Sequence, residues 1–258
     1  MDHTTPYSAD RSLYGKLRRR VARLVTTKPA QLPLERPMLT FSFDDAPASA
    51  VRDGARMLEK HGVRGTYFIS AGLAGQVDHL GGYATLDNVA RLAALGHEVA
   101  CHTFSHLDCG KARASAIAAE LAANAQALKS LGIAPETFAY PYGDVSPAAK
   151  GLINDGYLAG RALHHGLITT GTDLNQAPAV GIEGKAGETA AMDWMNRAVE
   201  AKAWLVLYTH DVRHNPSDWG CTPQALERLV IQALELHFDI VTFAEGARRA
   251  QPALRLAA

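Results

Sequence analysis

The sequence predicts an α/β protein built on a mostly parallel sheet. Short runs rich in β-branched and aromatic residues alternate with amphipathic helical patterns through most of the 258 residues, and this alternation is typical of βα units. The composition, 47% hydrophobic and 20% charged, is that of an ordinary globular protein. The number of βα units favours a barrel over a small open sheet, although the pattern alone leaves both architectures open.

The predicted elements follow in order along the chain. Strands are expected at residues 38–45, 64–70, 97–103, 136–142, 157–162, 178–184, 204–211 and 239–245. Amphipathic helices are expected between them, near residues 48–60, 87–95, 112–131, 146–155, 188–202 and 223–237. In either architecture, the functional site is expected at the carboxyl ends of the strands.

Residues 1–36 are predicted to be a basic helical extension and linker that precedes a single domain over residues 37–258. An apolar stripe at helical spacing consists of Leu13, Leu17, Val21 and Leu24. The basic residues on the other faces are Lys16, Arg18, Arg19, Arg20 and Arg23. Such a helix can lie on an anionic membrane surface. The alternative is a helix that docks on the domain and keeps its charges in solvent.

Charge and cysteine content restrict the partners and the location. The formal net charge is +0, which argues against a nucleic-acid-binding protein. No apolar run is long enough to span a membrane, and the first residues lack the apolar core of a secretory signal. The 3 cysteines form an odd set that is typical of reduced thiols. We therefore expect a cytoplasmic protein, with peripheral contact to the inner face of the membrane as a further expectation.

Polar side chains gather at the ends of predicted strands. They are Asp44 and Asp45 in the first strand, His102 and His106 at the third, and His210 in the seventh. Two imidazoles and one carboxylate can bind Zn²⁺ or another divalent ion and leave positions open for water and substrate. The alternative for an isolated H-x-x-x-H pair is two structural or surface histidines. A carboxylate pair at another strand end favours the metal site.

Four short motifs occur in order along the chain: SFDDAP, HTFSH, FAYPYGD and LYTHD. In this order and spacing they resemble the motifs of the polysaccharide deacetylases, also known as the NodB-homology domain or carbohydrate esterase family 4, over roughly residues 37–247. The resemblance implies a single domain with a distorted (β/α)7-type barrel of mostly parallel strands. Motifs of serine hydrolases, P-loop NTPases and dinucleotide-binding proteins are absent from the sequence.

The resemblance also implies a role for each matching residue. The residues that match the metal ligands are Asp45, His102 and His106, and the expected ion is Zn²⁺. Asp44 matches the base that takes a proton from the metal-bound water, and His210 matches the acid that protonates the leaving amine. Tyr142, in the Pro-Tyr-Gly turn, matches the residue whose backbone N–H helps to bind the oxyanion.

Two features depart from the family pattern. Many members have an arginine just before the Pro-Tyr-Gly turn that orients the base, but this chain has Ala139 and Tyr140 there. Arg161 and Lys185 are the candidates to replace it. The Asp-Trp pair at residues 193–194 matches the letters of another family motif, yet it lies in a predicted helix close to the last motif. The residue that orients the acid is therefore left open.

The sequence thus predicts a metal-dependent hydrolase that removes N-acetyl groups from N-acetylhexosamine residues of a bacterial polysaccharide or its lipid-linked precursor. A cytoplasmic member akin to the holdfast-type deacetylases would meet such precursors at the membrane. One alternative is a deformylase or other amidohydrolase of a lipid-linked aminosugar. The other is a catalytically inactive glycan-binding domain, against which the intact base argues, because binding alone would not need Asp44.

Overall fold

A central parallel sheet organises the molecule, whose computed structural model describes residues 12–251. The 8-stranded sheet has the order β7-β6-β5-β2-β1-β9-β8, with β10 paired to β1, and all its strand pairs are parallel. The strands are β1 (Met38–Asp44), β2 (Thr66–Ile69), β5 (Glu98–Cys101), β6 (Phe138–Ala139), β7 (Gly160–Arg161), β8 (Val180–Gly181), β9 (Trp204–Thr209) and β10 (Asp239–Ile240). The predicted α/β class is confirmed, and each predicted run contributes a strand.

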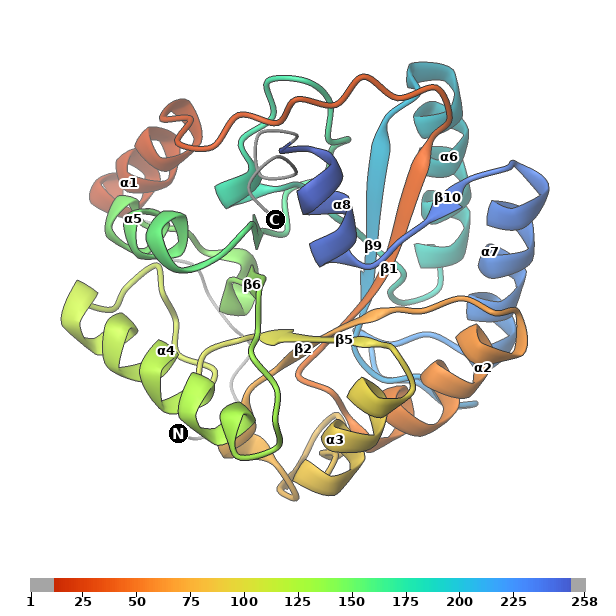
Figure 1. Cartoon of the computed structure of the whole chain (residues 1–258), viewed down its shortest axis with the longest axis horizontal. Helices are drawn as coiled ribbons and strands as arrows, with labels where there is room; N and C mark the ends of the chain where they lie inside the picture. The colour runs from red at the N-terminus through yellow and green to blue at the C-terminus, as the bar shows by residue number, and fades with distance from the viewer. Residues whose placement is uncertain (1–11, 252–258) are drawn as a thin grey trace.

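The middle strands are apolar because both of their faces are covered. Every residue of β1 and of β9 is buried, as expected for strands of a parallel sheet with helices packed outside. Figure 1 shows these two strands side by side through the centre of the molecule. Both strands run through the core to the rim that the carboxyl ends of the strands form, and Asp44 lies at this rim.

The segment before β8 links the two edges of the sheet. The Ala177 N–H donates to the Gly160 carbonyl and the Ala162 N–H donates to the Ala177 carbonyl, both at 2.8 Å, which ties this segment to β7. A few residues later Val180 pairs with Leu207 of β9. The sheet therefore bends into a distorted barrel, and the predicted barrel is confirmed over an open sheet.

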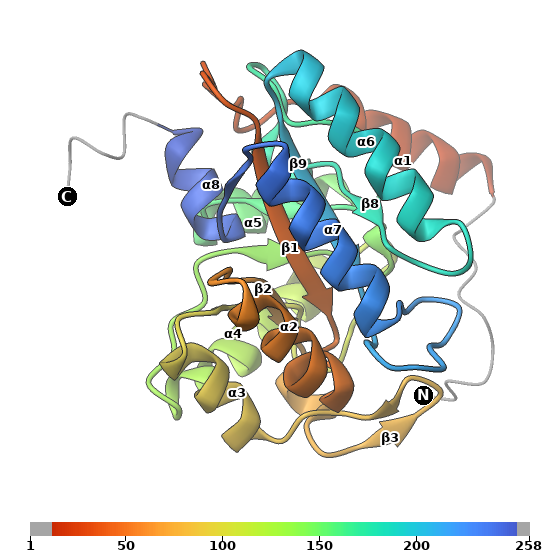
Figure 2. The ribbon, with the colours of Figure 1, turned by 90° about the vertical axis from the view of Figure 1, so that its right-hand side faces the viewer.

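The helices cover the outside of the barrel. They are α2 (Ala55–Lys60), which continues the π-helical turn η1 (Ala50–Gly54), α3 (Leu86–Ala94), α4 (Ala114–Lys129), α5 (Pro147–Gly156), α6 (Gly187–Ala201), α7 (Pro223–Glu235) and α8 (Phe243–Arg249). Figure 2 shows α6 and α7 next to each other, outside β1 and β9. Serine or threonine caps begin several of them, among them Ser146 of α5 and Thr222 of α7.

The last predicted strand is shorter in the structure than in the prediction. The run over residues 239–245 is a strand only at Asp239–Ile240, and α8 begins directly after Thr242. Thr242 accepts a hydrogen bond from the Glu245 backbone N–H, so the Thr-x-x-Glu sequence is the N-terminal cap of a helix. The β-branched residues before it led to the prediction of a longer strand. The small hairpin of β3 (Val77–Asp78) and β4 (Gly81–Gly82) was not predicted either, because two-residue strands leave no periodic pattern.

The predicted basic helix forms α1 (Leu13–Leu24), which lies beside α5 (Figure 1). Arg18 donates to the buried Asp144 carboxylate at 2.8 Å. From α5, Lys150 donates to the carbonyls of Ala22 and Val25. The helix is therefore docked, while the boundary between residues 36 and 37 stays a prediction. Within residues 12–251, no helix combines the length and the hydropathy of a membrane-spanning segment.

Candidate active site

Three side chains from two strand ends converge on one point. His102 Nε2 lies 3.5 Å from Asp45 Oδ1, and His106 Nε2 lies 3.4 Å from the same oxygen. Their ligand atoms all lie within 4.8 Å of one another. Asp45 and His102 are buried and His106 is half-buried. The structure thus brings together the three residues that the sequence marks as metal ligands.

Unusual backbone angles produce this convergence. Positive φ angles occur at Asp45 (61°), Ala46 (52°), Thr103 (61°), His106 (60°) and Tyr142 (58°). Residues without glycine's freedom adopt this region at a cost, and such residues concentrate at functional sites. At the end of β1 the turn lets Asp44 and Asp45 face different partners, although neighbouring side chains on a straight strand point to opposite sides.

The three residues fit a divalent metal ion. Around a tetrahedral ion with bonds of about 2.0–2.1 Å, ligand atoms stand about 3.3 Å apart, close to the distances at Asp45 Oδ1. The Nδ1–H of His102 donates to the Ala139 carbonyl at 2.8 Å, which leaves Nε2 to face Asp45. Burial, together with the charge of His106, lowers the pKa of His102 to about 4, so this imidazole is neutral at pH 7, as a ligand must be. Among the described residues, Asp45 Oδ1 is buried without a hydrogen-bond donor.

Asp44 has a buried cationic partner. The Arg161 guanidinium of β7 donates to Asp44 Oδ1, and neither side chain is more than 3% exposed. The Arg161 Cζ lies 5.0 Å from the Phe68 ring centroid and 5.3 Å from that of Tyr208, between two aromatic faces. Burial is the largest influence and disfavours the carboxylate, but the charges of Arg161, His102 and His210 and the Arg161 hydrogen bond together outweigh it and lower the pKa of Asp44 below its ordinary value.

His210 lies on the other side of Asp45 and has a carboxylate partner of its own. Its Nε2 is 4.0 Å from Asp45 Oδ2, and its Nδ1–H donates to Glu183 Oε1 at 3.1 Å. Tyr208 donates to the second oxygen of Glu183 at 3.2 Å. Burial lowers the pKa of His210, but the Glu183 hydrogen bond and the nearby carboxylates outweigh it and raise that pKa to about 9. His210 is therefore an imidazolium at pH 7.

The comparisons with known proteins agree with this arrangement. Residues 31–157 match the family described as polysaccharide deacetylase. A bifunctional xylanase/deacetylase from Pseudobutyrivibrio xylanivorans is 26% identical over 209 residues, which are 81% of this chain and 30% of that protein. The chain thus resembles the polysaccharide deacetylases.

Further matches to this deacetylase family cover different shares of the chain. A chitin deacetylase from a Pestalotiopsis species is 30% identical over 102 residues, which are 39% of this chain and 33% of that protein. The chain thus spans about a third of the length of the curated relatives it matches. The Xyl-CE4 domain of a multidomain xylanase from the hindgut metagenome of Trinervitermes trinervoides has the same fold, with a TM-score of 0.56 and 24% identity over 82% of this chain and 89% of that one.

The Pro-Tyr-Gly turn borders the cluster. It forms the short helical turn η3 (Pro141–Gly143), and the ring of Tyr142 contacts that of His106 at 4.4 Å between centroids. Trp219, in the loop after His210, is 41% exposed, and its carbonyl accepts the His210 backbone N–H at 3.1 Å. An exposed indole at this position offers a flat apolar face to a ligand.

The structure resolves two questions that the deacetylase motifs left open. Arg161, one of the two arginine substitutes considered, contacts Asp44, whereas Lys185 is exposed in the turn before α6. The Asp-Trp pair lies within α6, with Trp194 packed against the core and under the Arg197 guanidinium. Glu183, which contacts His210, was not among the predicted residues. The available signal was its place near the end of the predicted strand at residues 178–184, since functional side chains are expected at strand ends.

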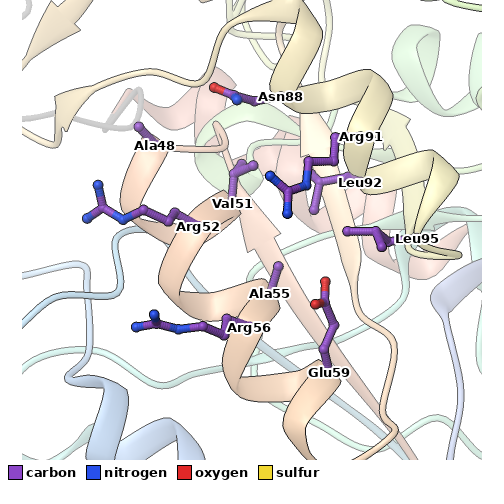
Figure 3. Close-up of a pocket in the computed structure, with 10 residues that line it drawn as sticks. All are labelled: Ala48, Val51, Arg52, Ala55, Arg56, Glu59, Asn88, Arg91, Leu92 and Leu95. Carbon is purple, nitrogen blue, oxygen red and sulfur yellow. The ribbon is translucent and has the colours of Figure 1, made fainter.

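A groove elsewhere on this deacetylase fold is separate from the cluster. It lies between the η1–α2 segment and α3, and Figure 3 shows Arg52 and Arg56 extending from one side and Arg91 reaching in from the other. Arg52 and Arg56 both pair with Asp53. None of the three clustered ligands lines this groove, so it takes no part in the candidate active site.

Proposed function

We propose that this protein is a metal-dependent N-deacetylase that hydrolyses the acetamide of N-acetylhexosamine residues in a bacterial polysaccharide or its lipid-linked precursor. The match to the polysaccharide deacetylase family supports the reaction class, and the names of the relatives, a chitin deacetylase and a xylanase/deacetylase, support an acetylated glycan as the substrate. We further propose the cytoplasm as its location, as the sequence predicts.

We assign the metal site to Asp45, His102 and His106, with Zn²⁺ as the ion that this mixed nitrogen and oxygen set suits. When bound, such an ion polarises the amide carbonyl and makes water more acidic. The carboxylate and the two neutral imidazoles would bind it. The other groups of the site then act on protons and on the developing charge.

Asp44 accepts the proton of the attacking water, and Arg161 holds its carboxylate charged and in place. As the carbonyl oxygen becomes negative, the Tyr142 backbone N–H donates to it, a contribution of about 3 kcal/mol for such a donor. His210 Nε2 then donates its proton to the amine nitrogen, because an amide nitrogen does not leave as an anion. One water and one amide become acetate and an amine.

A single observation carries this proposal. Two groups within one site are held in opposite protonation states by their partners: the Arg161 guanidinium bound to Asp44 keeps that carboxylate charged in spite of its burial, and the Glu183 carboxylate bound to His210 keeps that imidazole protonated. Pairs of titratable groups with pKa values pushed apart are the mark of acid–base catalysis. A domain that only binds glycans has no use for such a pair.

Acetate release from N-acetylated chito-oligosaccharides tests the proposal. Replacing Asp44→Asn removes the base without changing the shape of the side chain, so kcat is expected to fall by about 10²–10⁴. The matched control is Asp193→Asn on the exposed surface of α6, which should leave the rate unchanged. Formate release in place of acetate would identify a deformylase. No release of either acid by the metal-loaded wild type would leave a glycan-binding domain.

A further inference from the structure

The apolar stripe of α1 points away from the protein. Leu13 is 85% exposed, Leu17 61%, Val21 39% and Leu24 76%. A docked amphipathic helix normally buries its apolar face. At about 100° per residue, these four side chains fall within one arc, and Gly15 and Ala22, which are buried, fall on the opposite side.

Polar contacts, and not the stripe, attach α1 to the domain. Arg18 and Arg19 both approach Asp144 Oδ2, at 2.8 and 3.8 Å. Lys150 binds the carbonyls at the end of the helix and lies 2.6 Å from Asp173. Since Asp144, Lys150 and Asp173 are buried or nearly so, breaking these contacts would leave buried charges unpaired, which is strongly destabilising. The helix therefore cannot roll over to bury its leucines without leaving buried charges unpaired.

Cations flank the exposed stripe. Lys16, Arg20 and Arg23 are exposed, and they lie on one side of the arc that the leucines occupy. None of the ion pairs found among residues 12–251 involves any of the three. A leucine stripe with a row of solvated cations beside it matches an anionic lipid surface, where apolar side chains enter the acyl boundary and cations remain among the headgroups.

We propose that α1 is an interfacial anchor that binds the surface of an anionic membrane through Leu13, Leu17, Val21 and Leu24, with Lys16, Arg20 and Arg23 among the lipid headgroups. The lipid surface is chosen over a protein partner because the stripe is long, narrow and rimmed by one sign of charge. The proposal does not depend on the deacetylase reaction, since it concerns a face of α1 that the acid–base groups do not touch.

The attachment also sets where the anchor would bring the candidate active site. Asp144, which Arg18 binds, directly follows the Pro141–Gly143 turn that borders the metal ligands. A lipid-bound α1 therefore keeps the rim of the site close to the membrane surface. A sugar carried on a lipid would lie within the reach of that rim.

Cosedimentation of the full chain with vesicles tests the anchor. Wild type is expected to bind vesicles of phosphatidylglycerol and phosphatidylcholine at low salt, and to bind pure phosphatidylcholine much more weakly. Leu17→Gln with Leu24→Gln should weaken binding at least about tenfold, and Arg20→Gln with Arg23→Gln about fivefold per residue. These variants leave Gly15, Arg18 and Ala22 in place, whereas deleting α1 would strand Asp144 and Lys150.

Matched substitutions on other helices control for non-specific hydrophobic and electrostatic binding to vesicles. Ile231→Gln with Leu234→Gln removes two exposed apolar residues from α7, and Arg113→Gln with Lys129→Gln removes two exposed cations at the ends of α4. Both pairs should bind vesicles like wild type. Equal losses in the control and α1 variants would overturn the proposal, as would wild-type binding that does not depend on anionic lipid.

Two other occupants of the stripe give distinct results. A dimer in analytical ultracentrifugation that Leu17→Gln with Leu24→Gln dissociates, without vesicle binding by wild type, would assign the stripe to a second copy of the chain. Vesicle binding that arises only after removal of residues 1–11 would assign it to that segment. Either result would overturn the membrane proposal. Acetate release from soluble oligosaccharides, measured in parallel, should be the same for all these variants.

Discussion

Asp44 and Asp45 are adjacent carboxylates that would repel each other if both faced the same surroundings. The backbone turn at Asp45 separates them: Asp44 meets the Arg161 guanidinium, and Asp45 meets the two imidazoles. Each negative charge thus has a positive partner or a place for a cation. At the scale of single residues, the two adjacent carboxylates are tolerated because each faces different positively charged or metal-binding partners.

Replacing Arg161→Met should impair Asp44 as a base. Arg161 lowers the pKa of Asp44, so without it burial raises that pKa, and the acidic limb of the kcat/KM profile should move to higher pH. Breaking a buried pair on one side costs about 3–5 kcal/mol of stability, so urea unfolding should be followed as well. Arg161→Lys, which keeps the charge, should shift the limb less. An unmoved acidic limb in a folded Arg161→Met protein would remove the arginine from its positioning role.

Replacing Glu183→Gln should change the basic limb of the pH–rate profile. Glu183 raises the pKa of His210, whose value is about 9, and the acid must be protonated to work. The basic limb of the kcat profile should therefore move to lower pH, with a loss of about tenfold or more at high pH. Tyr208→Phe, which removes one hydrogen bond from Glu183, should give a smaller shift in the same direction. A shift of the acidic limb instead would contradict this assignment.

At the scale of elements, parallel strands decide which residues meet. Strands of different lengths end at the site, from β1 of seven residues to β6 and β7 of two residues each, and the candidate metal ligands lie just after strand ends. The loop from Thr103 to His106 is held by Glu120 of α4, which accepts the backbone N–H groups of Phe104 and Ser105. Helices thus fix the loops, and the loops place the ligands.

The α1–α5 contact gives a test at this scale. Lys150→Met should lower the free energy of unfolding by about 3–5 kcal/mol, because it strands the buried Asp173 carboxylate and two carbonyls at the end of α1. Hydrogen exchange should rise first in α1. The matched control is the exposed Lys129→Met on α4, expected to change stability by less than about 0.5 kcal/mol. Equal effects from both substitutions would show that the contact is weak.

At the scale of the whole molecule, the core and the site are built from different parts. The core lies between the sheet and the helices and comprises mainly aliphatic and aromatic side chains from β1, β9, α2, α6 and α7. The candidate metal ligands lie at the rim, in or next to turns with positive φ angles. We therefore expect the fold to assemble without the ion, unlike a small zinc finger.

Removal of the metal should separate activity from folding. Dialysis against a strong chelator should abolish acetate release, and added Zn²⁺ should restore it. The far-ultraviolet circular dichroism should stay unchanged, with a melting temperature lower by a few degrees, since a ligand of the folded state stabilises it by mass action. Asp45→Asn should lower the metal content measured by elemental analysis, and the chelator should no longer change the rate of acetate release. Full activity in a chelated, metal-free protein would overturn the assignment of the site.

Local patterns predicted much of this architecture. Buried strands such as β1 and β9 and amphipathic helices such as α7 carry their periodicity in short stretches of sequence, so the α/β class and the order of elements follow from it. The end of the chain was misjudged because Thr242 and Phe243 suit both a strand and a helix start. The hairpin of β3 and β4 was too short to leave a pattern.

The sequence by itself marked the candidate ligands and the proposed acid–base pair, because Asp44, Asp45, His102, His106 and His210 stand in recognisable local motifs. It did not determine the partners of the pair. Arg161 reaches Asp44 from a strand more than a hundred positions along the chain, and Glu183 reaches His210 from the turn after β8. Only the closure of the barrel brings these strand ends together. The outward face of α1 was likewise decided by the tertiary structure, since buried polar contacts to α5 fix the helix and an amphipathic pattern does not say which face docks.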